Sequence, residues 1–352
     1  MICVIAMAVS CDVHEFPAVP SLPSEPTPPA PERVFRLTLH HDQGLPLLGE
    51  FDYNSGNPVT SRSMLGPDEA FKPHCIRYTI NTYSEIRGIL SREPDTTYVF
   101  TRDEGTGLDA MFEIDIPKGD YNIVVWTDYV DAGSTADKYY DTSDFSEIIL
   151  SRRGEHYGSC SWRDGFYGLV STTVSRKDEH GGIETVDLGE ATIEMKRPMA
   201  RYTFISTDLR RFIENESKMR MQGAPSKAPG LDDYRVRFIY TRYMPCSFNL
   251  FTGKPADSWT GVEYESRIEP INDDEARVGF DYVFVNGDRT AATVGLEVLD
   301  KEGNLLARIP AFDVPLERSR HTIVKGEFLT TKSGGAMGIN PDFDGSFNIE
   351  IK

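Results

Sequence analysis

Hydrophobic and polar residues alternate with a period of two in two short stretches near the middle of the chain. In Ala191–Met195 and again in Ala200–Phe204, every second residue is apolar, and this pattern is typical of half-buried β-strands. Pro198 lies between the two stretches; it has no N–H for a sheet ladder and favours an extended conformation at Arg197. We therefore predict that one strand ends a first domain and the other opens a second domain. The alternative is one bent strand that crosses between two sheets of a single domain.

Similar strand patterns recur along both halves of the chain. The strands predicted in the first half are Val34–His41, Cys75–Ser84, Thr97–Thr101, Met111–Ile116, Asn122–Tyr129, Ser146–Leu150, Gly168–Val174 and Val186–Met195. Those predicted in the second half are Tyr234–Tyr240, Ser247–Phe251, Val278–Val285, Ala292–Leu299, Leu305–Phe312, His321–Leu329 and Phe347–Ile351. Closely spaced strands without helical periodicity between them are typical of β-sandwiches, so the fold class that we predict is all-β.

Turn-forming residues predict how several of these strands are connected. Lys118–Asp120, Asn286–Asp288 and Lys301–Asn304 have the composition of hairpin turns. Residues 42–73 are rich in Gly and Pro and are expected to be irregular, and a loop of that length usually serves a function or is mobile. Residues 215–233 are expected to form a polar loop.

One short helix is predicted, at the start of the second half. Thr207 and Asp208 are residues that cap helix N-termini. A helix that begins after them places Leu209, Phe212 and Ile213 on one face. We expect that face to pack on the second domain.

Length and composition support two domains. The chain has 352 residues, of which 39% are hydrophobic and 11% aromatic, so it can build real cores. The predicted domains are residues 33–197 and 198–352. The net charge of −18 argues against nucleic acid as a partner and against electrostatic docking on anionic lipid.

The N-terminus has the character of an export signal. Met1–Ser10 is apolar and uncharged, and it is too short to cross a bilayer as a helix. Ala8–Cys11 resembles the lipobox of bacterial lipoproteins, although Ala8 replaces the usual Leu, so we predict that residues 1–10 are removed and that Cys11 is acylated. Residues 12–32 include seven prolines and are expected to form an extended tether.

The common catalytic and metal-binding motifs are missing or incomplete. Gly105–Ala110 fits a dinucleotide fingerprint, but a strand pattern follows it where a helix is required. Asn340–Gly345 matches the first half of a calcium loop, but Pro341 interrupts it and no bidentate Glu stands at the twelfth position. His40 and His41 are adjacent on a strand and must point to opposite faces. We predict no enzyme activity, no cofactor and no metal site.

Three further cysteines and one tryptophan are candidates for a site. Cys75, Cys160 and Cys246 lie among apolar neighbours without zinc spacing, and we expect buried single thiols. Trp259 lies in a polar loop, where it is either a capping aromatic or an exposed platform for a ligand.

Several segments together resemble the fimbrillin-like lipoproteins of the Bacteroidia. The residues that carry this likeness are the leader ending in Ser10–Phe16, the joint Arg197–Tyr202, the late run Val314–Thr330 and the closing Gly338–Gly345. The likeness extends over the whole chain. It implies two tandem transthyretin-like β-sandwiches with a short helix in the second, and export as a lipid-anchored protein of the outer membrane and cell surface.

The resemblance also implies a function as a structural or adhesive subunit of a fimbria. Members of this family assemble when a protease removes the first strand after a loop Arg and a strand from the next subunit fills the groove by donor-strand exchange. Here Val34–Leu39 is the natural removable strand, and Arg62 is the only basic residue of the following loop before Lys72. The implied partners are other fimbrial subunits, the outer membrane through the lipid, and a ligand on a host or bacterial surface. The alternative is a surface lipoprotein that binds glycan for an uptake system.

The predicted lipid anchor can be tested by fractionating cells. Replacing Cys11 with Ala removes the acylated thiol, so the variant should leave the membrane fraction, because without acyl chains the apolar leader is too short to span. Unchanged membrane retention of Cys11→Ala would rule out acylation at this position.

Overall fold

The structure is a computed structural model that describes residues 35–53, 73–151, 156–174, 176–178, 184–186, 189–221 and 230–331. The predicted leader, tether and last strand lie outside these residues. Cys11, Arg62 and the Asn340–Gly345 motif lie outside them as well. Among the described residues, no helix has the length and apolar character that crossing a bilayer requires.

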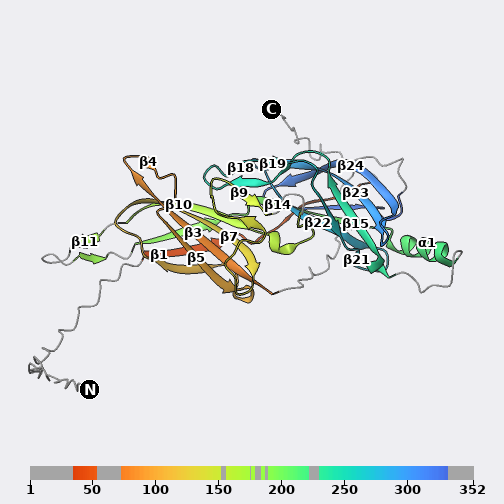
Figure 1. Ribbon diagram of the computed structural model, residues 1–352, viewed down its shortest axis with the longest axis horizontal. Coiled ribbons are helices and arrows are strands. Elements are labelled where there is room, and N and C mark those ends of the chain that lie inside the picture. The colour runs from red at the N-terminus through yellow and green to blue at the C-terminus, as the bar shows by residue number, and fades with distance from the viewer. Residues whose placement is uncertain are drawn as a thin grey trace, which may run out of the picture.

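Two sheets form a first β-sandwich, at the left in Figure 1. One sheet has the order β13–β1–β6, with β13 Glu190–Met195, β1 Phe35–His41 and β6 Ala110–Ile114. The other consists of β10 Phe166–Val174, β7 Gly119–Asp131, β3 His74–Ile86, β4 Ile89–Leu90 and β5 Thr96–Asp103. A small ladder of β11 Arg176–Asp178 and β12 Glu184–Val186 extends from this end. Apolar side chains from both sheets fill the core between them.

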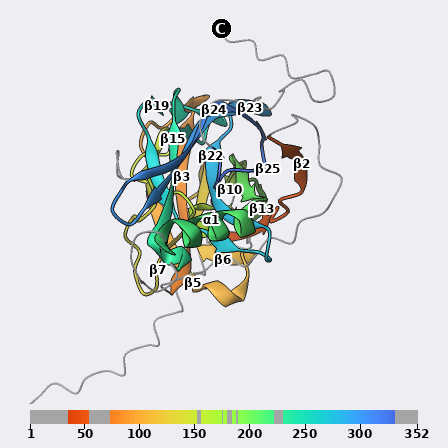
Figure 2. The same cartoon turned by 90° about the vertical axis from the view of Figure 1, so that its right-hand side faces the viewer.

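Two further sheets form a second β-sandwich, at the right in Figure 1. One has the order β2–β25–β14–β22–β21, with β2 Leu47–Asp52, β25 His321–Gly326, β14 Met199–Ser206, β22 Ala276–Phe284 and β21 Glu269–Pro270. The other has the order β20–β15–β23–β24, with β20 Glu263–Ser266, β15 Tyr234–Tyr240, β23 Arg289–Asp300 and β24 Leu305–Glu317. The helix α1, Leu209–Met221, lies at the far end of this sandwich, which faces the viewer in Figure 2.

Strands from both halves of the sequence meet between the sandwiches. A four-stranded sheet has the order β18–β17–β9–β8, with β18 Lys254–Pro255, β17 Ser247–Asn249, β9 Ile148–Leu150 and β8 Tyr140–Asp141. Beside it, β16 Met244–Pro245 pairs with β19 Ser258–Trp259. Single turns of 3₁₀-helix complete the chain at η1 Glu104–Thr106, η2 Ser161–Arg163 and η3 Leu231–Asp233. One continuous apolar cluster extends from this junction through the second core.

The all-β fold with a helix in the second half is confirmed, and most of the predicted strands are present. The division into two domains at Pro198 stays a prediction. Strands β2 and β9 precede Pro198 in the chain, yet β2 pairs with β25 and β9 pairs with β17, which both follow it.

Several predicted connections are wrong. The turn at Lys118–Asp120 does not close a hairpin, because β6 pairs with β1 while β7 pairs with β3 and β10 in the opposite sheet. The turn at Asn286–Asp288 also joins strands of opposite sheets, β22 and β23. The hairpin at Lys301–Asn304 is confirmed by the pairing of β23 with β24. The segment 42–73 is not irregular throughout, since it contains β2.

The helix α1 is longer than predicted and continues to Met221, into the segment expected to be a loop. Leu209 and Phe212 are buried as predicted, whereas Ile213 is exposed. The carboxylate of Asp208 accepts hydrogen bonds from the backbone N–H groups of Leu329 (3.3 Å) and Thr330 (2.8 Å). Asp208 therefore fastens the turn after β25 to the start of α1.

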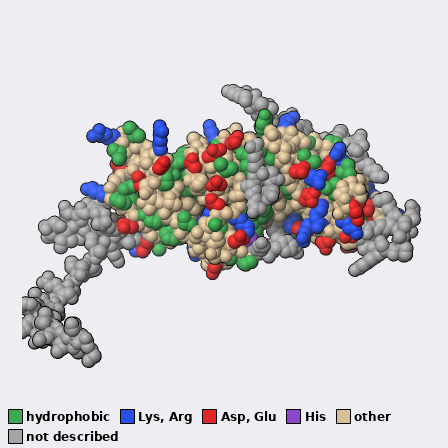
Figure 3. Space-filling view, in the orientation of Figure 1, with side chains coloured by type: hydrophobic (Ala, Val, Ile, Leu, Met, Phe, Trp, Pro, Cys, Tyr) green, Lys and Arg blue, Asp and Glu red, His purple; other side chains and the backbone are tan. Residues whose placement is uncertain are grey.

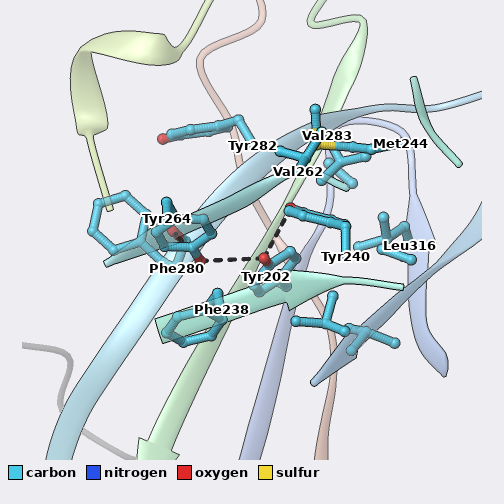
Figure 4. Close-up of a cluster of buried hydrophobic side chains, with 14 of the residues drawn as sticks. Tyr202, Phe238, Tyr240, Met244, Val262, Tyr264, Phe280, Tyr282, Val283 and Leu316 are labelled. Atoms are coloured by element: carbon cyan, nitrogen blue, oxygen red, sulfur yellow. Dashed lines mark hydrogen bonds between the residues drawn. The ribbon is translucent and has the colours of Figure 1, made fainter. Parts of the chain in front are cut away.

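A cluster of buried polar groups joins the first half of the chain to the second core. The carboxylate of Asp281, on β22, accepts hydrogen bonds from the guanidinium of Arg163 and the hydroxyl of Tyr240 (2.7 Å) and contacts the ring of His156. Tyr240 in turn bonds to Tyr202 (2.9 Å), as Figure 4 shows. Burial raises the pKa of Asp281, but the nearby charge of Arg163 and the ring of His156 more than offset this, so its pKa lies below the usual value.

This cluster predicts a large effect for a small substitution. Asp281→Asn keeps the shape of the side chain but leaves the Arg163 charge buried without its partner, so the free energy of unfolding should fall by about 3–5 kcal/mol. Asp274, which pairs with Arg210 on the surface, offers a matched control, and Asp274→Asn should leave the free energy of unfolding nearly unchanged, because solvent screens an exposed pair. Chemical denaturation at neutral pH measures both.

The difference in stability between the wild type and Asp281→Asn should depend on pH. The lowered pKa means that the wild type keeps the stabilisation from ionised Asp281 above the unfolded value of about 3.8 and loses it as the pH falls further. The difference between wild type and Asp281→Asn should therefore shrink in acid. Equal stability of the two proteins at pH 7 would contradict the assigned role.

Candidate functional site

The N-terminal strand β1 occupies the middle of a sheet. It pairs in parallel with β13 and antiparallel with β6, so that Leu37 lies between Ala191 and Phe112. Parallel pairing joins β1 to a strand more than 150 positions later in the sequence. We call the position between β13 and β6 the β1 slot. Without β1, the facing N–H and C=O groups of both neighbours would have no ladder partner.

The inner face of β1 is a row of large apolar side chains. Phe35, Leu37 and Leu39 are buried to 2% exposure or less. They belong to the first core together with Ile76, Tyr78, Ile80, Ile123 and Val125 of the opposite sheet. Each such side chain contributes roughly 1.5–3 kcal/mol when it is buried. The strand is therefore an integral part of the core.

The outer face and the last residue of β1 are polar. Arg36 pairs with Glu113 on β6 (3.3 Å). His40 and His41 point to opposite faces as predicted: His40 is exposed, whereas His41 is buried with its Nε2 3.1 Å from the Thr127 hydroxyl. Burial lowers the pKa of His41 to about 4 despite the nearby Asp109 carboxylate, so the ring is neutral at physiological pH.

The chain then crosses from the first sandwich to the second, and Arg197 holds the crossing. Its guanidinium donates hydrogen bonds to the backbone carbonyls of Gly44 (2.8 Å) and Gln43 (3.4 Å). It also forms a bidentate ion pair with the carboxylate of Asp164 (2.6 and 2.9 Å) and lies over the ring of Phe166 (4.7 Å). The predicted joint thus fastens the N-terminal segment to the body.

After the crossing, β2 adds to the edge of a sheet in the second sandwich. It pairs in parallel with β25, and Phe51 and Tyr53 are buried in the second core. Glu50 lies 3.7 Å from Lys325, and both side chains are buried. We call this edge position the β2 slot. Residues 35–53 therefore supply one strand to each sandwich.

The two predicted site residues, Cys11 and Arg62, are not part of β1 or β2. The structure places β1 and β2 between Cys11 and Arg62 in the chain but does not describe either residue. Sequence reasoning identified β1 and missed β2. The run Leu47–Asp52 does not alternate, because Leu47 and Leu48 are adjacent and Gly49 and the paired, buried Glu50 separate them from Phe51.

The other candidates from the sequence are possible metal ligands, three cysteines and Trp259. Among the described residues, no group of three His, Cys, Asp or Glu side chains could hold a metal ion. Cys75, Cys160 and Cys246 form no disulfide with one another, Cys160 being half-buried and the others buried. Trp259 is 7% exposed, so it is a capping aromatic and not a ligand platform.

A cavity of about 310 Å³ lies between the sandwiches, lined by residues that include His74, Tyr139, Trp162 and Arg277. The ring of Trp162 is stacked by His74 at 4.2 Å, and Arg277 is paired with Glu269. These groups are engaged with their neighbours, and the cavity adds no support to the glycan-binding alternative.

Known proteins share a family model and distant structural likenesses with this chain. Residues 46–352 match the model of a family of unknown function (DUF6562). No curated protein matches the sequence. Among solved structures, a putative polysaccharide binding protein from Bacteroides thetaiotaomicron is 13% identical over 78% of this chain and 80% of its own, with a TM-score of 0.37.

Two other solved structures are similar to the same extent. The fimbrial anchor protein Mfa2 from Porphyromonas gingivalis is 12% identical over 78% of this chain and 81% of its own, with a TM-score of 0.35. A putative cell adhesion protein from Bacteroides eggerthii is 11% identical over 89% and 92%, with a TM-score of 0.38.

The burial of β1 predicts a strong effect of a charge on its inner face. Leu37→Asp places an unpaired carboxylate in the first core, so the free energy of unfolding should fall by about 3–5 kcal/mol. Thr38→Asp puts the same charge on the outer face and should cost about 1 kcal/mol or less. Denaturation curves of the two variants measure the difference, and equal midpoints would mean that β1 is peripheral.

Proposed function

We propose a surface role for this chain, which belongs to the family of unknown function DUF6562. It is a structural or adhesive subunit of a fimbria, without enzyme activity, that is held at the outer membrane by lipid on Cys11 and assembles by strand exchange. The resemblance of the sequence to fimbrillin-like lipoproteins is the first support. The geometry of residues 35–53 is the second.

The observation that carries the proposal is that one N-terminal segment fills two slots. Its five buried side chains, Phe35, Leu37, Leu39, Phe51 and Tyr53, are divided between the two cores. A cut after Arg62 would leave this segment attached by non-covalent contacts alone. Its loss would open an apolar groove in the first sandwich and an unpaired edge in the second, and both favour the addition of a new strand.

Strand exchange also accounts for the order of events. In the precursor the slots are filled in cis, so no groove is available to another copy. After cleavage, a strand from a second copy that enters the β1 slot buries the same apolar surface. The two copies use different surfaces for this contact, and a contact of that kind builds an open chain of subunits when the rotation does not close a ring.

The proposal predicts that proteolysis triggers assembly. Treatment of the full chain with an Arg-specific protease should produce a fragment that begins at Ser63, followed by polymers visible by electron microscopy. Arg62→Lys should resist this cut and stay monomeric. N-terminal sequencing identifies the cleavage, and size-exclusion chromatography follows the loss of monomer.

A competing peptide separates strand exchange from non-specific aggregation. A synthetic peptide of residues 33–53 should refill both slots and suppress the polymers. The same peptide with Leu37→Asp and Phe51→Asp should not, because a charge cannot enter either core. Cleavage at Arg62 and release of the N-terminal fragment without any polymer would overturn the assembly mechanism.

A further inference from the structure

The hairpin between β3 and β4 ends in two exposed isoleucines. Ile86 and Ile89 are paired across a two-residue turn, and they are 69% and 74% exposed. Arg87 and Gly88 form the turn with φ of 55° and 76°, the left-handed conformation of the tight hairpin turns. We call Ile86–Ile89 the hairpin tip. It presents two large apolar side chains and one cation at the end of a projecting ribbon.

A pocket of about 730 Å³ lies beside the helix α1, between that helix and the start of β24. Its apolar lining consists of Phe212, Leu305, Leu306, Ala307 and Leu329. Its polar lining includes Glu216, Lys218 and Arg308. Leu305 is 48% exposed, so apolar surface is accessible at this place. We call it the end pocket.

The hairpin tip and the end pocket lie at opposite ends of the molecule. Figure 1 shows β4 near the left-hand end of the long axis, inside the β11–β12 ladder, and α1 at the right-hand end. Hydrophobic and basic side chains gather at the β4 end in Figure 3. The tip of one copy therefore cannot reach the pocket of the same copy, whereas two copies in line bring the two features together.

We propose that the hairpin tip of one copy seats in the end pocket of the next copy, as a head-to-tail contact between subunits. The inference rests on the proposed fimbrial function and adds a contact that is separate from strand exchange. The two sites are different surfaces of one chain, so the contact is heterologous and repeats along a filament.

The shape and charge of the end pocket match the hairpin tip. The volume of the end pocket accommodates two isoleucine side chains, and its apolar lining matches them. Arg87 at the tip can meet Glu216 of the pocket, whose carboxylate also accepts a hydrogen bond from the Tyr234 hydroxyl (3.0 Å). The tip is small, so the contact is weak in isolation and orients subunits that strand exchange holds together.

A photo-crosslinking amino acid at position 87 tests the contact. The full chain with Cys11→Ala, which carries no lipid to gather copies, is mixed in equal amounts with an isotopically heavy preparation. No protease is added, so β1 and β2 stay in place. We expect crosslinks between light and heavy copies, from position 87 to residues 212–218 or 305–308, identified by mass spectrometry.

Variants with matched exposure give the control. Ile86→Ser with Ile89→Ser should lower the yield of these crosslinks at least tenfold, and Leu305→Asp should do the same when it is in the accepting copy. Leu169, on β10, is 47% exposed, and Leu169→Asp should leave the yield unchanged. Unaltered melting temperatures establish that each variant is folded.

Several outcomes would overturn the contact. These are crosslinks confined to one copy, crosslinks to residues 332–352 in place of the end pocket, or equal yields for Leu305→Asp and Leu169→Asp. If cleavage at Arg62 still produces polymers while the crosslinks are absent, strand exchange stands and the tip-in-pocket contact falls. Crosslinks without polymers after cleavage would support the tip-in-pocket contact and contradict strand exchange.

Discussion

The fold depends on the burial of residues 35–53 in two cores at once. β1 and β2 both pair in parallel with strands that come far later in the chain, so neither is held by a local hairpin. The five apolar side chains of this segment together contribute roughly 8–15 kcal/mol of burial, which is comparable with the whole net stability of many domains. Because the segment precedes the other described strands in the chain, one covalent connection, residues 54–72, links it to them.

Charged groups at the junction fix how the two sandwiches meet. Arg197 bonds to the crossing strand and to Asp164, while Arg163 reaches from the first half of the sequence to Asp281 in the second core. Both guanidinium groups are buried, and a buried charge is costly unless it is fully bonded. A displaced arrangement would break these bonds, so the pairs penalise alternative orientations even where their net contribution to stability is small.

The sequence predicts strands far better than it predicts their partners. Tyr234–Tyr240 alternates except at Ile239 and forms β15 with the predicted bounds. The turn at Lys118–Asp120 has the composition of a hairpin, yet its strands lie in opposite sheets, because turn residues specify a change of direction and not the sheet that follows. Strand β2 escaped detection because its buried Glu50 is polar in the sequence and finds Lys325 only in the fold. The β1 and β2 slots could not be predicted either, because each is formed by strands that lie far apart in the sequence.

The distribution of charge and apolar surface suits an assembly that starts only after cleavage. The net charge of −18 makes intact copies repel one another, although salt screens this beyond about 10 Å. Burial of apolar side chains acts at contact and scales with the area removed from water. In the precursor, the largest apolar faces of the N-terminal segment are already turned inwards, so strand exchange between intact copies has no groove to fill. Once the β1 and β2 slots open, the burial available at contact exceeds the screened repulsion, and association is directed to the strand positions where apolar side chains and unpaired backbone groups occur together.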